Sequence, residues 1–119
     1  MKIRLTFLSW FAMVAGTLPV VAAPVSFNRD IRPILANHCF ACHGPDEEKR
    51  EAELRLDVEN FAKASRDGSF AIKSGDIEAS RLVSRIQTTD QDLVMPPSHF
   101  QKPLMSRQKQ LLKLSLIHI

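Results

Sequence analysis

The stretch "NHCFACHGPDEEKR", residues 37–50, holds the two cysteines of this 119-residue chain, with a histidine directly after the second. Two thiols three positions apart beside an imidazole serve three chemistries: a redox-active disulfide, a zinc site and covalent attachment of a c-type haem. These chemistries differ in the structural setting that they need, and the cellular compartment limits which of them is available. The rest of the sequence therefore has to distinguish them.

The first residues, "MKIRLTFLSWFAMVAGTLPVVAAPV", have the layout of a secretory signal peptide. Lys2 and Arg4 are positive, an apolar run follows, and small residues end it. We expect cleavage after Ala22, so that residues 1–22 are the leader and the remaining chain is periplasmic or otherwise exported. The alternative is an uncleaved anchor in contact with the membrane. The apolar run is shorter than the roughly 20 residues that span a bilayer, and this disfavours the uncleaved anchor.

Removal of the leader leaves a nearly neutral chain. The 16 basic residues lose Lys2 and Arg4, and 13 acidic residues oppose the rest. This balance gives no support for a nucleic-acid surface, which needs Lys and Arg clustered on one face. The remaining length suits one small domain, assigned to residues 23–113. Domains of this size often need a disulfide, a metal or a covalent cofactor to complete their core.

Hydrophobic spacing predicts a mostly helical domain. A first helix is expected from residue 28 or 30 to 37, continuing through the cysteines until Gly44 and Pro45 end it. Residues 46–53 form a mixed charge run expected at the surface. Residues 54–64 are expected to be extended first and helical afterwards.

The second half of the chain is predicted in the same way. Residues 65–76 are expected to be a loop with two glycine turns, and Asp76 to cap a helix over 77–87. Residues 88–103 are too rich in proline and polar residues to be regular, and Ser106 is expected to start a last helix. The predicted fold class is therefore all-α, with three to four short helices and long loops. The inward positions share helical spacing: Ile31, Ile34, Leu35, His38, Leu82, Val83, Ile86, Leu111, Leu112 and Leu116.

The setting of the two cysteines favours haem attachment. C-x-x-C-H is the attachment pattern of c-type haem, because two thiols on one helical turn reach the two vinyl groups of a porphyrin. Cys39 and Cys42 are the predicted thioether sites, and His43 the predicted proximal ligand of the iron. Attachment takes place on exported chains, in agreement with the leader. We expect one haem c per chain.

The other chemistries fit less well. A thioredoxin-like pair wants a βαβ setting, which this pattern of short helices does not provide. A zinc site would take both cysteines and two of His43, His38 and His99, but the adjacent Cys42 and His43 diverge awkwardly for one tetrahedron. A structural disulfide across the short loop is the plainest alternative. His38 is expected to be a packed neighbour rather than a ligand.

A haem iron with one imidazole needs a second protein ligand or an open face. Methionine is the usual partner in cytochromes c, and after the leader only Met95 and Met105 remain. Met95 lies in "DLVMPPSHF", where two prolines stiffen the chain and reduce the entropy lost in holding the sulfur in place. Met95 is therefore the predicted distal ligand, with His99 as its rival.

Four segments in order, "VSFNRDIRPILANHCFACHGPD", "LRLD", "SGDIEASRLVSRI" and "LVMPP", resemble the planctomycete-type cytochrome c domain over residues 25–113. The resemblance implies the same site residues as above and adds Leu54 and Leu56 as haem-packing side chains. In that family the domain usually begins a much longer secreted protein. This chain departs from the pattern at its end, where "LLKLSLIHI" stands. Residues 114–119 are therefore expected to be an aberrant or truncated tail.

The expected function is electron transfer by a single covalent haem in an exported protein. The domain would be no enzyme, although a further C-terminal part could be one, and its redox partner protein is left open. Two alternatives come from other classes: a haem enzyme or sensor with an open distal face, and a zinc-binding interaction module.

Overall fold

The computed structural model describes residues 23–118, so the predicted leader lies outside the described residues. Within that range the chain forms five α-helices, one π-helical turn, one 3-10 turn and one two-stranded sheet. The structure is rich in helix, in agreement with the predicted helical character, but it is not plainly all-α, because it also contains the two-stranded sheet. Among residues 23–118, no helix combines the length and the apolar composition needed to cross a membrane.

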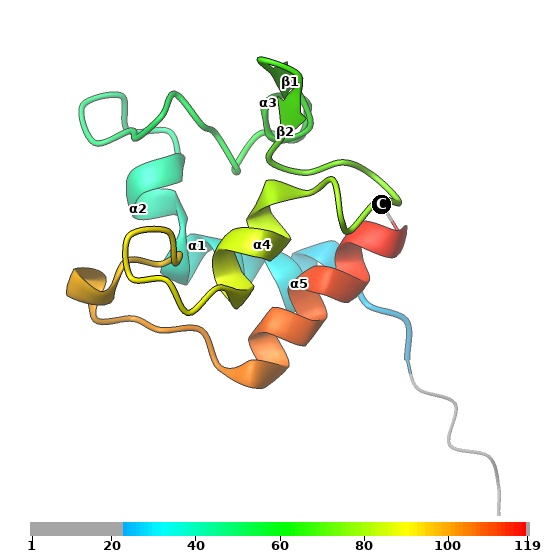
Figure 1. Ribbon diagram of the computed structural model, residues 1–119. Helices are drawn as coiled ribbons and strands as arrows, with labels where there is room; N and C mark the ends of the chain where they lie inside the picture. Colours follow the sequence, from blue (N-terminus) through cyan, green and yellow to red (C-terminus); the bar gives the residue numbers. More distant parts are fainter. Residues whose placement is uncertain (1–22, 119) are drawn as a thin grey trace, which may run out of the picture.

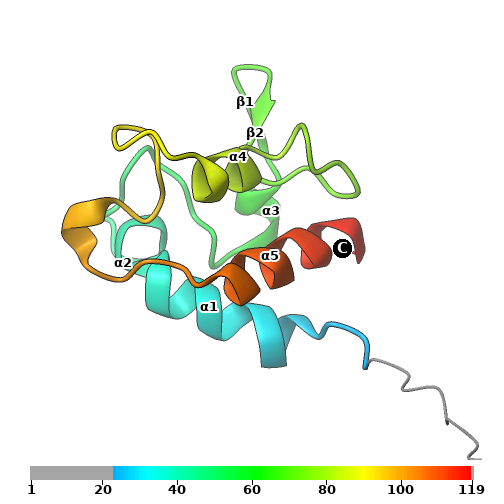
Figure 2. The ribbon, with the colours of Figure 1, turned by 60° about the horizontal axis from the view of Figure 1, so that its bottom comes forward.

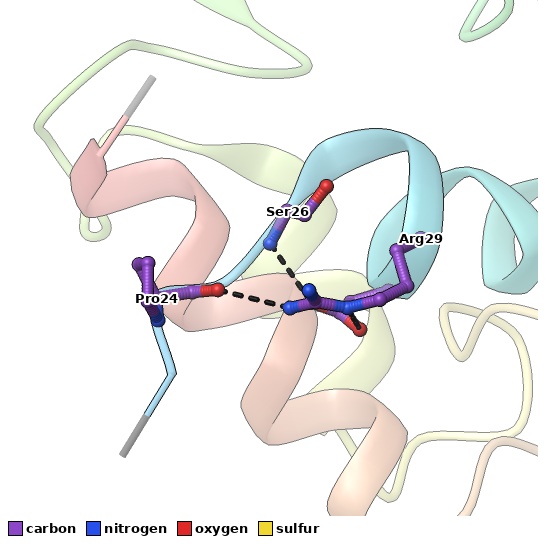
Figure 3. A network of polar contacts seen from close by, with 4 residues as sticks. Pro24, Ser26 and Arg29 are labelled. Atoms are coloured by element: carbon purple, nitrogen blue, oxygen red, sulfur yellow. Dashed lines mark hydrogen bonds and ion pairs between the residues drawn. The ribbon is translucent and has the colours of Figure 1, made fainter. Parts of the chain in front are cut away.

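The first helix consists of a π-helical turn, η1 (Phe27–Ile31), followed by α1 (Arg32–His38). Asp30 stabilises its start, because Oδ2 accepts a hydrogen bond from the backbone N–H of Ser26 at 2.8 Å. Arg29 binds the same carboxylate at 2.8 Å and also donates to the carbonyl oxygen of Pro24 (Figure 3). The Arg29 guanidinium and then the Ser26 N–H lower the pKa of Asp30 to about 2. The carboxylate therefore stays charged in neutral and mildly acidic solution.

The core consists of two clusters that share neighbours. All four predicted inward residues of the first helix are buried, which confirms its apolar face. The first cluster holds Ile31, Ile34, Leu35, Ile86, Leu104 and Leu112, and the second holds Leu56, Ala62, Ile72, Val83 and Leu116. Cys39, Phe40 and Leu82 pack against both clusters. The segment with the first cysteine thus joins the two halves of the core.

The helix does not continue unbroken through the cysteines. Cys39 leaves the helical conformation (φ −128°, ψ −38°) and separates α1 from α2 (Phe40–His43). In a longer helix, the carbonyl oxygens at the end of α2 would accept hydrogen bonds from the next helical turn. Here they accept hydrogen bonds from the loop that follows α2. Glu51 N–H donates to Cys42 O and Leu56 N–H donates to His43 O, both at 2.8 Å. These bonds satisfy the end of α2 and fix the loop against it.

Gly44 ends α2, as predicted from the sequence. A Cβ atom at this position would lie 2.3 Å from the carbonyl oxygen of Phe40. That oxygen belongs to the backbone of α2, so it cannot move without distorting the turn that carries His43. Glycine is therefore the residue that fits.

Gly44→Ala should lower the free energy of unfolding by about 1–3 kcal/mol, the usual cost of overpacking. Gly75→Ala is the matched control, since a Cβ there meets nothing within 4 Å but the backbone has φ +73°. Its cost should come from the left-handed backbone alone, about 1–2 kcal/mol. Thermal unfolding of both variants measures the difference. A Gly44→Ala protein as stable as the parent would contradict the described contact.

The prediction of a loop over residues 65–76 is wrong in part. Strands β1 (Ser65–Arg66) and β2 (Ser69–Phe70) form an antiparallel hairpin. The turn residues Asp67 and Gly68 both have positive φ, 49° and 78°. Asp-Gly is a strong sequence signal for such a two-residue turn. The Asp-Gly signal was present, but strands of two residues are too short to show the alternation of apolar and polar residues that marks a strand in a sequence.

Helix α4 (Arg81–Gln87) ends where predicted but begins later than Ile77. Asp76 caps a turn instead, with Oδ1 accepting from Ala79 N–H at 3.0 Å. The Ser80 hydroxyl donates to the carbonyl oxygen of Asp76 at 2.6 Å and accepts from Lys73 N–H at 2.9 Å. Ser80 also pairs with Phe70, and together these bonds hold the segment before Arg81 out of the helix.

The last helix, α5 (Ser106–His118), starts where predicted and lies against both α4 and η1 (Figures 1 and 2). Leu112 and Leu116 are buried, as expected. The helix continues without a break past Lys113, and Gly75 N–H donates to Leu116 O at 2.8 Å. The first residues of the expected tail therefore belong to the packed domain. Two short turns complete the fold: α3 (Glu59–Ala62) and the 3-10 turn η2 (Ser98–Phe100). The helical end predicted for residues 54–64 is present, but the chain before it forms no strand and bends over residues 56–58.

Candidate functional site

One pocket of about 540 Å³ collects the predicted site residues. Cys39, Cys42 and His43 line it from the α2 side, and Met95 and His99 line it from the segment between α4 and α5. These two parts of the chain lie far apart in the sequence and on the same side of the molecule in Figure 1. The volume lies within the range of roughly 300–1,000 Å³ typical of small-molecule and cofactor sites.

The walls of the pocket are mainly apolar. Leu54 and Leu56, which the resemblance assigned to haem packing, are among them. The other apolar wall residues are Ala41, Ala52, Ala71, Leu82, Ile86, Pro96, Pro97 and Phe100. Such walls favour a large apolar ligand and reduce the water around any polar group bound among them.

The orientation of the His43 ring is set by a backbone atom. Nδ1 lies 3.2 Å from the carbonyl oxygen of Glu51. Because a carbonyl oxygen only accepts, Nδ1 carries the proton, and Nε2 keeps a lone pair for a metal. Burial lowers the pKa of His43, which favours the neutral imidazole that metal binding requires. Sequence reasoning missed this role of Glu51, since any residue can supply a carbonyl oxygen.

The two cysteines carry free, half-buried thiols. Burial, and then the neighbouring Cys42, raise the pKa of the Cys39 thiol to about 11. Redox-active thiols have the opposite property, a pKa lowered by nearby positive charge or a helix N-terminus. Cys39 is therefore protonated at neutral pH, which disfavours the interpretation as a redox-active disulfide.

The two candidate methionines lie in different surroundings. Met95 is half-buried, lines the pocket, and is fixed to the end of α4 by a hydrogen bond from its N–H to Arg85 O at 2.9 Å. Met105 is 69% exposed and does not line the pocket. The rival His99 also lines the pocket but is exposed. The structure thus places Met95 at the site and Met105 away from it.

His38 is a buried link between helices. Its Nδ1 lies 2.9 Å from Lys102 O, and its Nε2 lies 3.2 Å from the side-chain nitrogen of Gln108. A neutral ring satisfies both contacts, donating from Nδ1 and accepting at Nε2. No ring nitrogen is left for a metal, in agreement with the prediction of a packed neighbour.

The described part of the chain contains no set of side chains arranged as zinc ligands. Within residues 23–118, no group of three or more His, Cys, Asp or Glu side chains is placed to hold a metal ion. A structural zinc site needs four such ligands around one centre.

A small helical domain with a C-x-x-C-H turn and a methionine on one apolar pocket defines the class of c-type cytochromes. The model of the family Planctomycete cytochrome C matches residues 39–99, from the first thiol to beyond Met95. The chain belongs to this family. Membership implies a covalently bound haem. No curated protein and no solved structure matches the chain.

Proposed function

We propose that this domain carries single electrons through one covalently bound haem c and performs no bond chemistry of its own. The observation that carries the proposal is the shared pocket: the C-x-x-C-H turn and Met95, from distant parts of the chain, line one apolar space. Family membership supports the same conclusion.

The donor set of the pocket fits this group. Cys39 and Cys42 would each add S–H across one vinyl group, with sulfur bonding one carbon and hydrogen the other. The addition needs no oxidant and releases nothing, and both thiols are free for it. His43 would bind the iron through Nε2, because Glu51 O holds Nδ1.

Met95 and the apolar walls would set the electrochemistry. Bound haem supplies an iron that accepts and releases one electron. A thioether in the sixth position stabilises the ferrous state, and burial among apolar side chains disfavours the extra positive charge of the ferric state. Both effects raise the reduction potential.

We also propose that the chain is exported and loses residues 1–22, and that its electron-transfer partner is another redox protein. The leader pattern and the attachment of c-type haem outside the cytoplasm support the location. An electron carrier has to receive its electron from one redox centre and pass it to another, which supports a redox protein as the partner.

A spectroelectrochemical titration tests the proposed function. The chain, expressed with its leader and a cytochrome c maturation system, should show one reversible transition that follows a one-electron Nernst curve. The same chain expressed without the maturation system is the control and should show none. A matured protein whose haem does not cycle reversibly, or cycles with two electrons, would contradict an electron carrier.

A further inference from the structure

Three arginines stand out among the apolar walls of the pocket. Arg66, Arg81 and Arg85 line it, and Glu51 is the one acidic residue among its lining. Guanidinium groups remain charged at any physiological pH. The pocket therefore carries an excess of positive charge, which favours an anionic ligand.

These arginines contact neutral acceptors. Arg66 donates to the carbonyl oxygens of Ala52 and Glu53 at 2.8 and 2.6 Å. Arg85 donates to Leu93 O at 3.1 Å, and Arg81 reaches the Ser69 hydroxyl at 3.4 Å. Within residues 23–118, none of the three forms an ion pair with a carboxylate.

Arg55, unlike the three arginines of the pocket, is paired with a carboxylate. It binds Asp57 through two hydrogen bonds, at 3.1 and 2.6 Å. The three pocket arginines have no such partner in the described residues, although guanidinium groups bind carboxylates in this two-point way very well.

Arg81 and Arg85 also repel each other. They lie four residues apart on α4, a spacing at which side chains are neighbours on one helix face. Two like charges there destabilise the helix, and a carboxylate between or beside them would remove that cost. Arg66 differs, since its two terminal nitrogens already hold the loop at Ala52 and Glu53.

We propose that Arg81 and Arg85 form an anion-binding edge of the pocket and bind the two propionate carboxylates of the haem, an inference that rests on the proposed function. Arg66 is a positioning residue that adds positive charge and fixes the loop next to Glu51. The arginines thereby determine which edge of the macrocycle lies against α4. Their positive charge also favours the ferrous state over the more positive ferric state.

The test compares Arg81→Gln/Arg85→Gln with Arg32→Gln/Arg107→Gln, which removes two exposed arginines that do not line the pocket. Both doubles change the net charge equally. Three quantities are measured on matured protein: haem absorbance after denaturation, the resonance Raman band of the propionates, and the midpoint potential at fixed pH and ionic strength.

Arg81→Gln/Arg85→Gln should keep covalent haem, shift the propionate band and lower the midpoint potential more than the control does. Arg81→Lys/Arg85→Lys keeps the charge but loses the two-point hydrogen bonding. It should therefore shift the band while largely restoring the potential. If the glutamine double does not accumulate, each single glutamine variant should show part of both shifts.

Glutamine variants with the band and potential of the control would overturn the assignment of the arginines and leave the proposed function intact. A parent protein without covalent haem would instead overturn the proposed function itself. The two failures are therefore distinguishable.

Discussion

Cys39→Ala/Cys42→Ala should yield a chain with no covalently attached haem. The chain contains two cysteines, and both line the pocket, so the double variant removes every thiol that can form a thioether. Each single variant should retain at most one thioether and accumulate much less mature protein. Absorbance of the denatured, desalted chain in the haem region measures the effect.

The expected change is total loss of the haem signal from the double variant. Ser74→Ala, at an exposed position outside the pocket, is a control that should match the parent. Covalent haem in the double variant would mean that attachment uses another residue, and the assignment of both cysteines would be wrong.

Met95→Ala should open the sixth coordination position to water. A thioether favours ferrous iron, so its loss should lower the midpoint potential by an amount on the order of 0.1 V, since axial ligands set haem potentials over about 0.8 V. The reduced variant should bind carbon monoxide, and the ferric variant should lose the weak absorption near the red edge that marks sulfur–iron bonding. Visible spectra and a redox titration measure all three changes.

Met105→Ala is the matched control for Met95→Ala. Met105 is exposed and does not line the pocket, so this variant should keep the parent spectrum and potential. The reverse pattern, with the sulfur band lost in Met105→Ala alone, would identify Met105 as the distal ligand in place of Met95. If neither variant changed the spectrum, His99 or an open distal face would be the better interpretation.

The parts of the fold that were predictable from sequence depend on local periodicity. The first helix buries Ile31, Ile34 and Leu35 as its spacing indicates, and Leu116 is buried on α5. Gly44 ends α2 because a side chain there would collide with the helix itself, which is also a local effect. The candidate site was predictable because C-x-x-C-H and the Met-Pro-Pro segment are compact motifs.

The parts that sequence reasoning missed depend on contacts that follow neither helical nor strand periodicity. Ser80 delays α4 through bonds to Lys73 and a pairing with Phe70, neither of which leaves a periodic pattern. The carbonyl oxygen of Glu51 orients His43, although the residue lies in a charge run that suggests a solvated surface. The arginines of the pocket come from a hairpin and from α4, and only the folded chain brings them together.

The most direct test of the central claim is the mass of the matured chain after denaturation and removal of free haem. We expect a chain cleaved after Ala22 that carries the mass of one haem, with the absorbance of haem c on the same species. A denatured chain with the mass of the polypeptide alone, and haem recovered in the solvent extract, would contradict it.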